Sequence, residues 1–368
     1  MARSLTDAVR RLLDGQHGVV TRAQLHAVGV SDRVTARLLR DGTLQRLHPG
    51  AYVEAQRFRA ADEKVQHCMR LLALQLGAPD AAAYAQSGAL AWGLPVRHVP
   101  GRPMVVRESS RPRIRSARVR RSGSISDHVT RHAGLTVTTI AKTVVDVAAE
   151  LPFADALITV DAALRRGVTP GELSDVCSSA PPLRRVDDAR RALDAGDPYS
   201  ESWLESLSRG RMIELHMPLP LCNVVLRARG RWVRVDFLLV ELGVVGEADG
   251  SGKYLESVDP GRAVVRERDR QRWVEDFGFE VARWGTPDVA REGLAMARRI
   301  DRAIARQAGR HFTWPTEVLA EVPLLGAVSP PERVVREVHR LAALGFPIAF
   351  TDAWGQPVAE GPLTRPAP

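Results

Sequence analysis

Residues 233–249 constrain the fold most, because two short apolar runs are separated there by a break. Residues 233–239 alternate apolar and more polar side chains, as in a strand with one buried face. Residues 241–243 (ELG) interrupt this pattern, and residues 244–249 resume it. Two strands joined so closely predict a β-hairpin.

The predicted hairpin brings acidic side chains together. A turn centred on residues 241–242 places Asp236 opposite Glu247. Carboxylates that face each other repel and destabilise a sheet, and a divalent cation between them removes that cost. Hard oxygen ligands suit Mg²⁺ or Mn²⁺. We therefore predict a metal site formed by Asp236, Glu247 and Asp249, with Lys253 close enough to supply a positive charge.

Length and composition set broad limits. A chain of 368 residues is longer than one core usually serves, so we expect two or three domains. We find no apolar run of the roughly 18 residues that a membrane span needs and no secretory signal, so we expect no membrane association. The three cysteines, Cys68, Cys177 and Cys222, are far apart, which suits a reducing cytoplasm.

The net charge of +9 is compatible with nucleic-acid binding without proving it. Of the 52 basic residues only Lys64, Lys142 and Lys253 are lysine. A lysine can act as a compact, tunable charge, whereas arginine is effectively never deprotonated. Lys253 is therefore of interest beside the acidic hairpin.

Residues 1–58 predict a winged helix-turn-helix domain that binds double-stranded DNA. Thr21 and Gln24 form a capping box at the start of a second short helix. Ser31 caps a third helix, with Val34 and Leu38 expected to face inward. A hairpin over residues 44–53 follows, turning at a Pro-Gly pair.

The third helix is basic on its outward face, which carries Arg33, Arg37 and Arg40. In a winged helix-turn-helix such a helix enters the major groove, and the hairpin, which holds Arg46, touches the DNA backbone. The alternative is a helical unit with a solvated arginine face that makes protein contacts.

Residues 59–195 predict a mostly helical middle domain. The expected helices cover residues 65–76, 87–92, 138–150 and 153–166, and one more starts near Thr169. Between the second and third lies an arginine-rich extended piece at residues 111–121. It could track phosphates, or it could be a sheet edge that charge protects from aggregation.

Residues 198–310 predict a domain in the order helix, two or three strands, helix, strand. The first helix starts at Ser202, the hairpin follows, and a charged helix at residues 262–277 leads into a strand at 279–284. A further helix is expected at residues 288–308. Residues 311–368 are proline-rich, with one helix at 332–344, and we expect the last ten residues to be disordered.

Two resemblances follow from these residues. Residues 15–53 resemble the N-terminal winged-helix domain of AbiEi-type antitoxins, and residues 86–95 (QSGALAWGLP), 134–146 and 161–164 look like its continuation. Residues 200–290 resemble an uncharacterised family related to very-short-patch-repair endonucleases, within the PD-(D/E)xK superfamily. The matching pieces are SWLES at 202–206, VDF at 235–237, EADGSGKY at 247–254 and GFEVARW at 278–284.

The resemblances imply an α+β multidomain chain with a winged helix-turn-helix, a mixed middle domain and a C-terminal α/β restriction-endonuclease-like domain. By resemblance, Asp236 and Glu247 bind Mg²⁺, Glu205 is an auxiliary acid and Lys253 is the basic partner in phosphodiester hydrolysis. The residue two positions after Glu247 departs from the superfamily pattern, because it is Asp249 where lysine is expected.

Structural alternatives exist for each of these acids. Glu205 could complete a capping box with Ser202. Asp249 with Gly250 is a turn signal by itself, and Asp236 could pair with Arg234 on the surface. Lys253 could simply be exposed.

Three functions remain open from the sequence. The first is a Mg²⁺-dependent DNA endonuclease brought to duplex DNA by the winged helix. The second is an antitoxin-type transcriptional regulator with an inactive nuclease-like domain. The third is a protein that neutralises a toxin partner through the middle domain.

Overall fold

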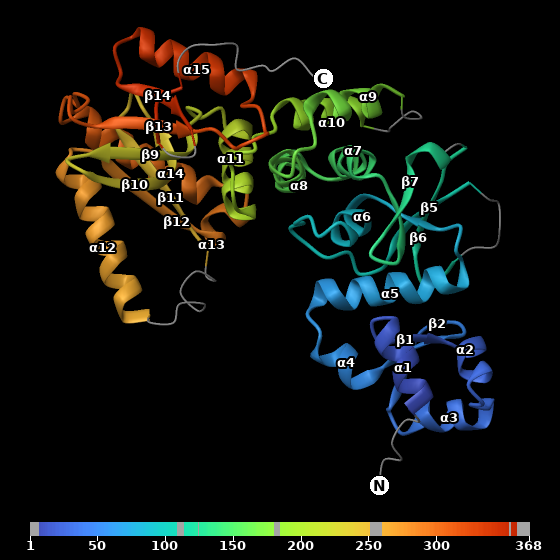
Figure 1. The fold of residues 1–368 in the computed structure, drawn as a ribbon. Coiled ribbons are helices and arrows are strands. Elements are labelled where there is room, and N and C mark those ends of the chain that lie inside the picture. Colours follow the sequence, from blue (N-terminus) through green and yellow to red (C-terminus); the bar gives the residue numbers. More distant parts are fainter. Residues whose placement is uncertain are drawn as a thin grey trace. The chain divides into compact units, whose positions relative to one another are not determined.

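The structure, a computed structural model, describes residues 7–108, 114–123, 125–179, 185–250, 260–352 and 355–358. The chain divides into two compact units (Figure 1). Unit 1 comprises Met1–Glu150 and Glu172–Ala189, and unit 2 comprises Leu151–Gly171 and Arg190–Pro368. Helices and sheets occur in both units, which confirms an α+β multidomain chain. The predicted boundaries after residues 58, 195 and 310 stay predictions.

Unit 1 begins with the three helices and the hairpin that the sequence predicts. The elements are α1 (Asp7–Gly15), β1 (Val19–Thr21), α2 (Arg22–Ala27), α3 (Asp32–Arg40), β2 (Leu44–His48) and β3 (Ala51–Glu54). The strands form an antiparallel sheet in the order β1-β3-β2. The predicted capping box is present at the start of α2, where Thr21 and Gln24 bond each other's backbone N–H groups. This arrangement is consistent with a winged helix.

One residue of α3 does not face the core as predicted. Val34 is 44% exposed, whereas Thr35 is buried and its hydroxyl donates a hydrogen bond to the Ser31 carbonyl. Thr35 and Leu38 are three residues apart and therefore share the inward face. The prediction chose Val34 for its apolar side chain, but the helix phase places it outward.

The rest of unit 1 combines helices with a sheet. Its helices, apart from short turns, are α4 (Ala55–Ala60), α5 (Glu63–Gly77), α6 (Ala85–Ala91) and α7 (Ile140–Glu150). Its strands are β4 (Ala82–Ala83), β5 (Met104–Arg107), β6 (Arg118–Arg121), β7 (Val129–His132) and β8 (Leu135–Thr138), in the order β6-β5-β4-β8-β7. The predicted helices are present, and the sheet is an addition to the mostly helical expectation. β6 lies within the predicted arginine-rich piece, of which residues 111–113 fall outside the described residues.

Two of the boundaries between the units fall inside helices, namely α9 (Pro170–Ser179) and α10 (Val186–Asp194). Unit 2 contains α8 (Phe153–Arg165) packed against α11 (Trp203–Glu214). Gly210 permits this packing, because a Cβ atom there would lie 2.7 Å from the Ala154 Cα atom. The buried guanidinium of Arg209 also binds Asp161 of α8 at 2.8 Å.

A six-stranded mixed sheet forms the core of unit 2, in the order β12-β11-β10-β9-β13-β14 (Figure 1). Its strands are β9 (Leu221–Ala228), β10 (Arg231–Leu239), β11 (Val244–Asp249), β12 (Glu280–Gly285), β13 (Leu319–Pro323) and β14 (Ile348–Thr351). β11 and β12 are parallel and are joined through α12 (Pro260–Asp276). The order of α11, three strands, α12 and β12 is the order predicted from the sequence.

The predicted hairpin is formed by β10 and β11. Phe237 pairs with Gly246, and Leu239 pairs with Val244. This register centres the turn on residues 241–242, so the predicted turn is confirmed. Gly243 takes a φ of +59° inside the turn, a conformation that favours glycine.

The helix predicted at residues 288–308 is divided in two. The segments are α13 (Thr286–Ala290) and α14 (Leu294–Ala308). Glu292 and Gly293 between them have φ values of +57° and +73°. Left-handed residues cannot continue a right-handed helix, which explains the break.

The proline-rich segment contributes to the same sheet. β13 pairs with β9, and β14 pairs with β13. The predicted helix at 332–344 is present as α15 (Glu332–Ala343). The last ten residues, predicted to be disordered, lie outside the described part. None of the described helices is both long and apolar enough to span a membrane.

Candidate nucleic-acid interface and carboxylate cluster

The outward face of α3 carries the predicted DNA-binding arginines. Arg33, Arg37 and Arg40 are exposed, as is Arg46 on β2. Their spacing of four and three residues places the first three on one side of the helix. Val34 lies beside Arg33 and is also exposed. The face therefore offers guanidinium groups and the apolar Val34 side chain to solvent.

The acid next to this face is held by a threonine. Asp41 accepts hydrogen bonds from the Thr43 hydroxyl at 2.7 Å and from its backbone N–H at 3.1 Å. These bonds, with a smaller contribution from Arg37 and Arg40, lower the pKa of Asp41. The arginines are thus not joined to this carboxylate by an ion pair.

A carboxylate joins α2 to α3. Asp32 at the start of α3 accepts a hydrogen bond from Arg22 Nε at 2.7 Å and contacts His26 Nε2 at 2.8 Å. The bonds from Arg22 and then His26 lower the pKa of Asp32. These contacts link α2 to the start of α3 at the protein surface.

Three of the predicted catalytic residues lie together in unit 2, forming what we call the carboxylate cluster: Glu205, Asp236 and Glu247. They come from α11, β10 and β11, and all three are buried. The charge of Asp236 contributes to the raised pKa of both glutamates, after the larger effect of burial. The predicted proximity of Asp236 and Glu247 is thus present.

Glu205 also has a structural role. The Ser202 hydroxyl accepts a hydrogen bond from the Glu205 N–H at 3.2 Å, which caps α11. The Glu205 carboxylate accepts bonds from the Glu201 N–H at 2.8 Å and from Asn223 Nδ2 at 2.7 Å. The Ser202 half of the capping box weighed for Glu205 is therefore observed, whereas the Glu205 carboxylate bonds the Glu201 N–H in place of the Ser202 N–H.

Asp236 and Glu247, the other two carboxylates of the cluster, also accept hydrogen bonds. Asp236 Oδ2 accepts a hydrogen bond from the Ala248 N–H at 2.9 Å. Glu247 Oε2 accepts one from Arg270 Nη2 of α12 at 2.6 Å. Burial, with the charge of Asp236, nevertheless raises the pKa of Glu247 to about 7.

Of the two remaining predicted residues, Asp249 lies two positions after Glu247 on β11. Asp249 forms an ion pair with Arg283 Nη1 at 3.3 Å and is partly exposed. Lys253 lies outside the described residues. Within the described ranges, no group of three or more His, Cys, Asp or Glu side chains is arranged to hold a metal ion.

The sequence reasoning missed Arg270 and Arg283. Glu247 lies opposite Arg283 in the parallel register of β11 and β12. A strand–helix–strand order predicts that pairing, so Arg283 could have been found from the expected elements. Arg270 could not, because its contact with Glu247 depends on how α12 packs.

These arginines affect whether the carboxylates can bind the predicted Mg²⁺ or Mn²⁺. Mg²⁺ requires oxygen ligands at near-octahedral positions. The Arg270 guanidinium instead bonds the Glu247 oxygen. As arranged, these side chains do not fit the metal unless Arg270 moves away.

Comparison with known families identifies the first segment of the chain. Residues 7–55 match the family model described as "Transcriptional regulator, AbiEi antitoxin". The AbiEi segment runs from α1 through β3 and contains all four predicted DNA-binding arginines. The resemblance to AbiEi antitoxins is confirmed for these residues, and the resemblance of unit 2 to nucleases stays a prediction.

Two curated proteins are similar to part of the chain. They are the uncharacterized proteins MT2308, from Mycobacterium tuberculosis strain CDC 1551 / Oshkosh, and Rv2248, from strain ATCC 25618 / H37Rv. Each is 32% identical over 188 residues, or 49% of this chain and 66% of the relative. The chain thus spans slightly less than two thirds of their length. A crystal structure of the RV2827C protein from Mycobacterium tuberculosis aligns at 18% identity with a TM-score of 0.35, covering 60% of this chain and 85% of that one.

Proposed function

We propose that the protein is a DNA-binding transcriptional regulator of the AbiEi antitoxin kind, with a nuclease-like unit 2 that does not hydrolyse DNA. The match of residues 7–55 to the antitoxin model carries this proposal. The same residues contain a helix–turn–helix and a three-stranded sheet with exposed arginines.

The arginine face suits duplex DNA. B-DNA admits an α-helix in its major groove, where a guanidinium can bond O6 and N7 of guanine. Arg33 and Arg37 are assigned this role, and the exposed Val34 is suited to a thymine methyl group. Arg40 and Arg46, at the helix end and on the hairpin, are assigned to phosphates.

The inactive state of unit 2 is proposed from two features. Asp249 occupies the position at which the nuclease pattern has lysine. Arg270 neutralises Glu247, the acid that a metal-dependent nuclease would need. We assign this carboxylate cluster, held by hydrogen bonds and a guanidinium, to the packing of α11, β10, β11 and α12.

A DNase footprint of the region upstream of the protein's own gene tests the regulator. The reaction is digested by DNase I after the protein has bound in EDTA, with the digestion cations added only for the brief cut. We expect a protected, sequence-specific site of one or two helical turns that forms without Mg²⁺. Protection that spreads uniformly over the DNA, or none at all, would contradict specific regulation.

A Mg²⁺-dependent endonuclease is the second candidate function. The convergence of Glu205, Asp236 and Glu247 on a helix followed by a hairpin favours it. The test is plasmid nicking in Mg²⁺, in Mn²⁺ and in EDTA, with Asp236→Ala and Glu247→Ala as comparisons. Metal-dependent nicking that both substitutions abolish would replace the proposed inactive unit by an enzyme.

An antitoxin also implies a protein partner, and we propose that this partner is a toxin. Co-expression with the product of a neighbouring gene tests this assignment. We expect the neighbour's product to arrest growth alone and to be tolerated with this protein. Growth arrest that this protein does not relieve would rule out neutralisation and leave DNA regulation standing.

A further inference from the structure

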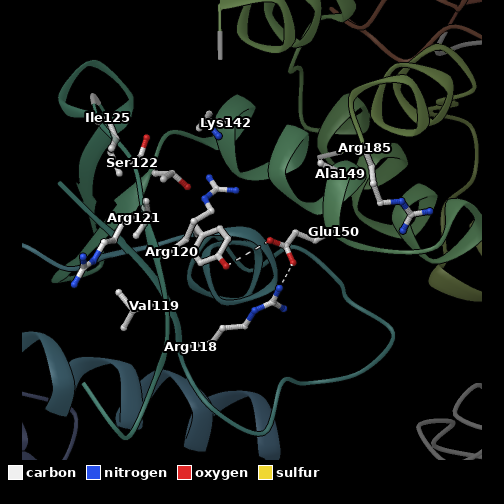
Figure 2. A pocket seen from close by; sticks show the side chains of 14 residues that line it. Arg118, Val119, Arg120, Arg121, Ser122, Ile125, Lys142, Ala149, Glu150 and Arg185 are labelled. Atoms are coloured by element: carbon white, nitrogen blue, oxygen red, sulfur yellow. Dashed lines mark hydrogen bonds and ion pairs between the residues drawn. The ribbon is translucent and has the colours of Figure 1, made fainter. Parts of the chain in front are cut away.

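Unit 1 contains a pocket that neither proposed function uses (Figure 2). Its volume is about 640 Å³, which lies within the range of small-molecule sites. The walls come from β6, the residues that follow it, α7, Tyr84 and Arg185. The α3 arginines do not line it, so the pocket is separate from the candidate DNA interface.

The pocket is strongly basic. Five cationic side chains line it, with Glu150 as the only carboxylate among the residues that do: Arg118, Arg120, Arg121, Lys142 and Arg185. Three of these come from one four-residue strand. Both arginine and lysine bind phosphate groups. The guanidinium donates two parallel hydrogen bonds, and the ammonium acts as a compact positive charge.

The available carboxylates do not match these cations one to one. Arg118 binds Glu150 at 2.7 Å, and Arg185 binds Asp188 at 2.7 Å. Arg120 and Lys142 share one oxygen of the buried Asp146, at 2.8 and 2.5 Å. Arg121 lies on the opposite face of β6 from Arg118 and Arg120, because neighbouring residues of a strand alternate (Figure 2). The excess charge is that of the Arg120–Lys142 pair, in which two cations share one carboxylate. Positive charge is therefore left over at the pocket wall, and an anion would balance it.

The excess of positive charge is unfavourable at Lys142, because this side chain is buried. Its side chain is 5% exposed, and desolvation lowers its pKa despite the charge of Asp146. Among the described residues, Asp146 is the carboxylate paired with Lys142, and a buried cation that shares its carboxylate with a second cation is poorly compensated. An anionic group in the pocket would supply the compensation that Asp146 divides between two partners.

The basic wall is held in place before any ligand binds. The Arg120 guanidinium lies over the Tyr84 ring, 4.4 Å from its centroid. The Tyr84 hydroxyl donates to Glu150 at 3.5 Å, and Figure 2 shows Arg118 directed at the same carboxylate. Side chains fixed in this way lose little freedom on binding, which favours affinity.

We infer that this pocket binds a small phosphorylated ligand of nucleotide size. The phosphate lies against Arg118 and the Lys142–Arg120 pair, and the rest of the ligand fills the remaining volume. The excess of arginine over carboxylate favours a phosphate, with two or more charges, over a singly charged carboxylate. The inference stands whether unit 2 is an enzyme or not.

Isothermal titration calorimetry of the full chain tests the site, with inorganic phosphate, pyrophosphate, ATP and GTP as separate probes. We expect saturable binding of at least one phosphorylated probe at one site per chain. Arg118→Gln combined with Arg120→Gln should weaken it at least tenfold. Neither side chain is buried, so circular dichroism should show an unchanged fold.

Arg115→Gln is the matched control, because Arg115 is exposed on the same segment and does not line the pocket. It should leave the affinity unchanged. Equal weakening by the control would reduce the effect to general electrostatics and overturn the site. Absence of saturation with all four probes at millimolar concentration would also overturn it. Binding of a single-stranded oligonucleotide without binding of any of these probes would show a nucleic-acid surface instead.

Discussion

Arg37 is the residue whose charge and exposure bear most directly on DNA recognition, because it lies midway along the arginine face of α3. Arg37→Ala should weaken binding to the specific site by about tenfold or more, within the roughly 1–3 kcal/mol that a bidentate base contact contributes. Fluorescence anisotropy over a series of salt concentrations measures the effect. A lost phosphate contact alone would lower the salt slope by about one.

Arg59→Ala is the control for this substitution. Arg59 is also an exposed arginine of unit 1 but lies on α4. It should change neither affinity nor salt dependence appreciably. If both variants bind equally weakly, the effect belongs to net charge and α3 is not the reading element.

Glu247 makes a pH-dependent contribution to stability. Burial raises its pKa from an ordinary value of 4.5 to about 7, so the folded chain binds a proton that the unfolded chain has released between these values. The stability attributable to Glu247 is therefore present at low pH and is lost as pH rises through about 7. Glu247→Gln has no such loss.

We expect the free energy of unfolding of Glu247→Gln, relative to wild type, to improve by on the order of 2 kcal/mol between pH 5 and pH 8. Urea denaturation at the two pH values measures it. Glu275→Gln, which alters an exposed carboxylate of α12, is the comparison. A Glu247→Gln difference that stays constant with pH would show that the carboxyl group does not titrate as assigned.

At the scale of single elements, α2 and α3 differ in how their first turns are capped. Thr21 caps α2 through its side chain, whereas Ser31 makes no side-chain cap bond at α3. Thr21→Ala should therefore destabilise the protein by about 1 kcal/mol, the typical contribution of an N-cap. Ser31→Ala should cost much less.

Thermal unfolding of the two variants by circular dichroism measures this difference. Each substitution removes the hydroxyl of the residue before a helix, and Thr21→Ala removes a methyl group as well. Thr21→Val, which replaces the hydroxyl by a methyl group, separates the two contributions. An equal loss in both would mean that the Ser31 hydroxyl also caps α3 in solution.

At the scale of the whole molecule, the proline-rich segment is part of the core of unit 2. Trp314, Val322 and Phe350 are buried, and β13 covers the edge of β9. Each large apolar side chain contributes roughly 1.5–3 kcal/mol on burial. Several of them together approach the whole stability of a domain, about 5–15 kcal/mol.

A chain ending at Arg310 should therefore lose cooperative unfolding of unit 2 and aggregate. Urea titration followed by circular dichroism, with size-exclusion chromatography, measures both effects. A chain ending at Val358 keeps every described strand and should behave as the full chain does. Soluble, cooperatively folded protein from the shorter chain would show that β13 and β14 are dispensable.

The sequence by itself determined the elements whose signals are local. Thr21 and Gln24 marked a helix start, and the apolar alternation with its break marked the hairpin and its register. Asp236 and Glu247 were found because the hairpin register brings them together, whereas Glu205 was found from the resemblance to nucleases. Such signals need only the periodicity of a helix or strand and the chemistry of caps and turns.

Tertiary structure decided the rest, because it depends on residues far apart in the chain. β4 has only two residues, too few for a periodic pattern, and it takes its place from neighbours on either side. β13 joins β9 across about ninety residues, and Arg270 reaches Glu247 only because α12 packs on the sheet of unit 2. Long-range pairing and side-chain neutralisation follow from packing, which no local pattern encodes.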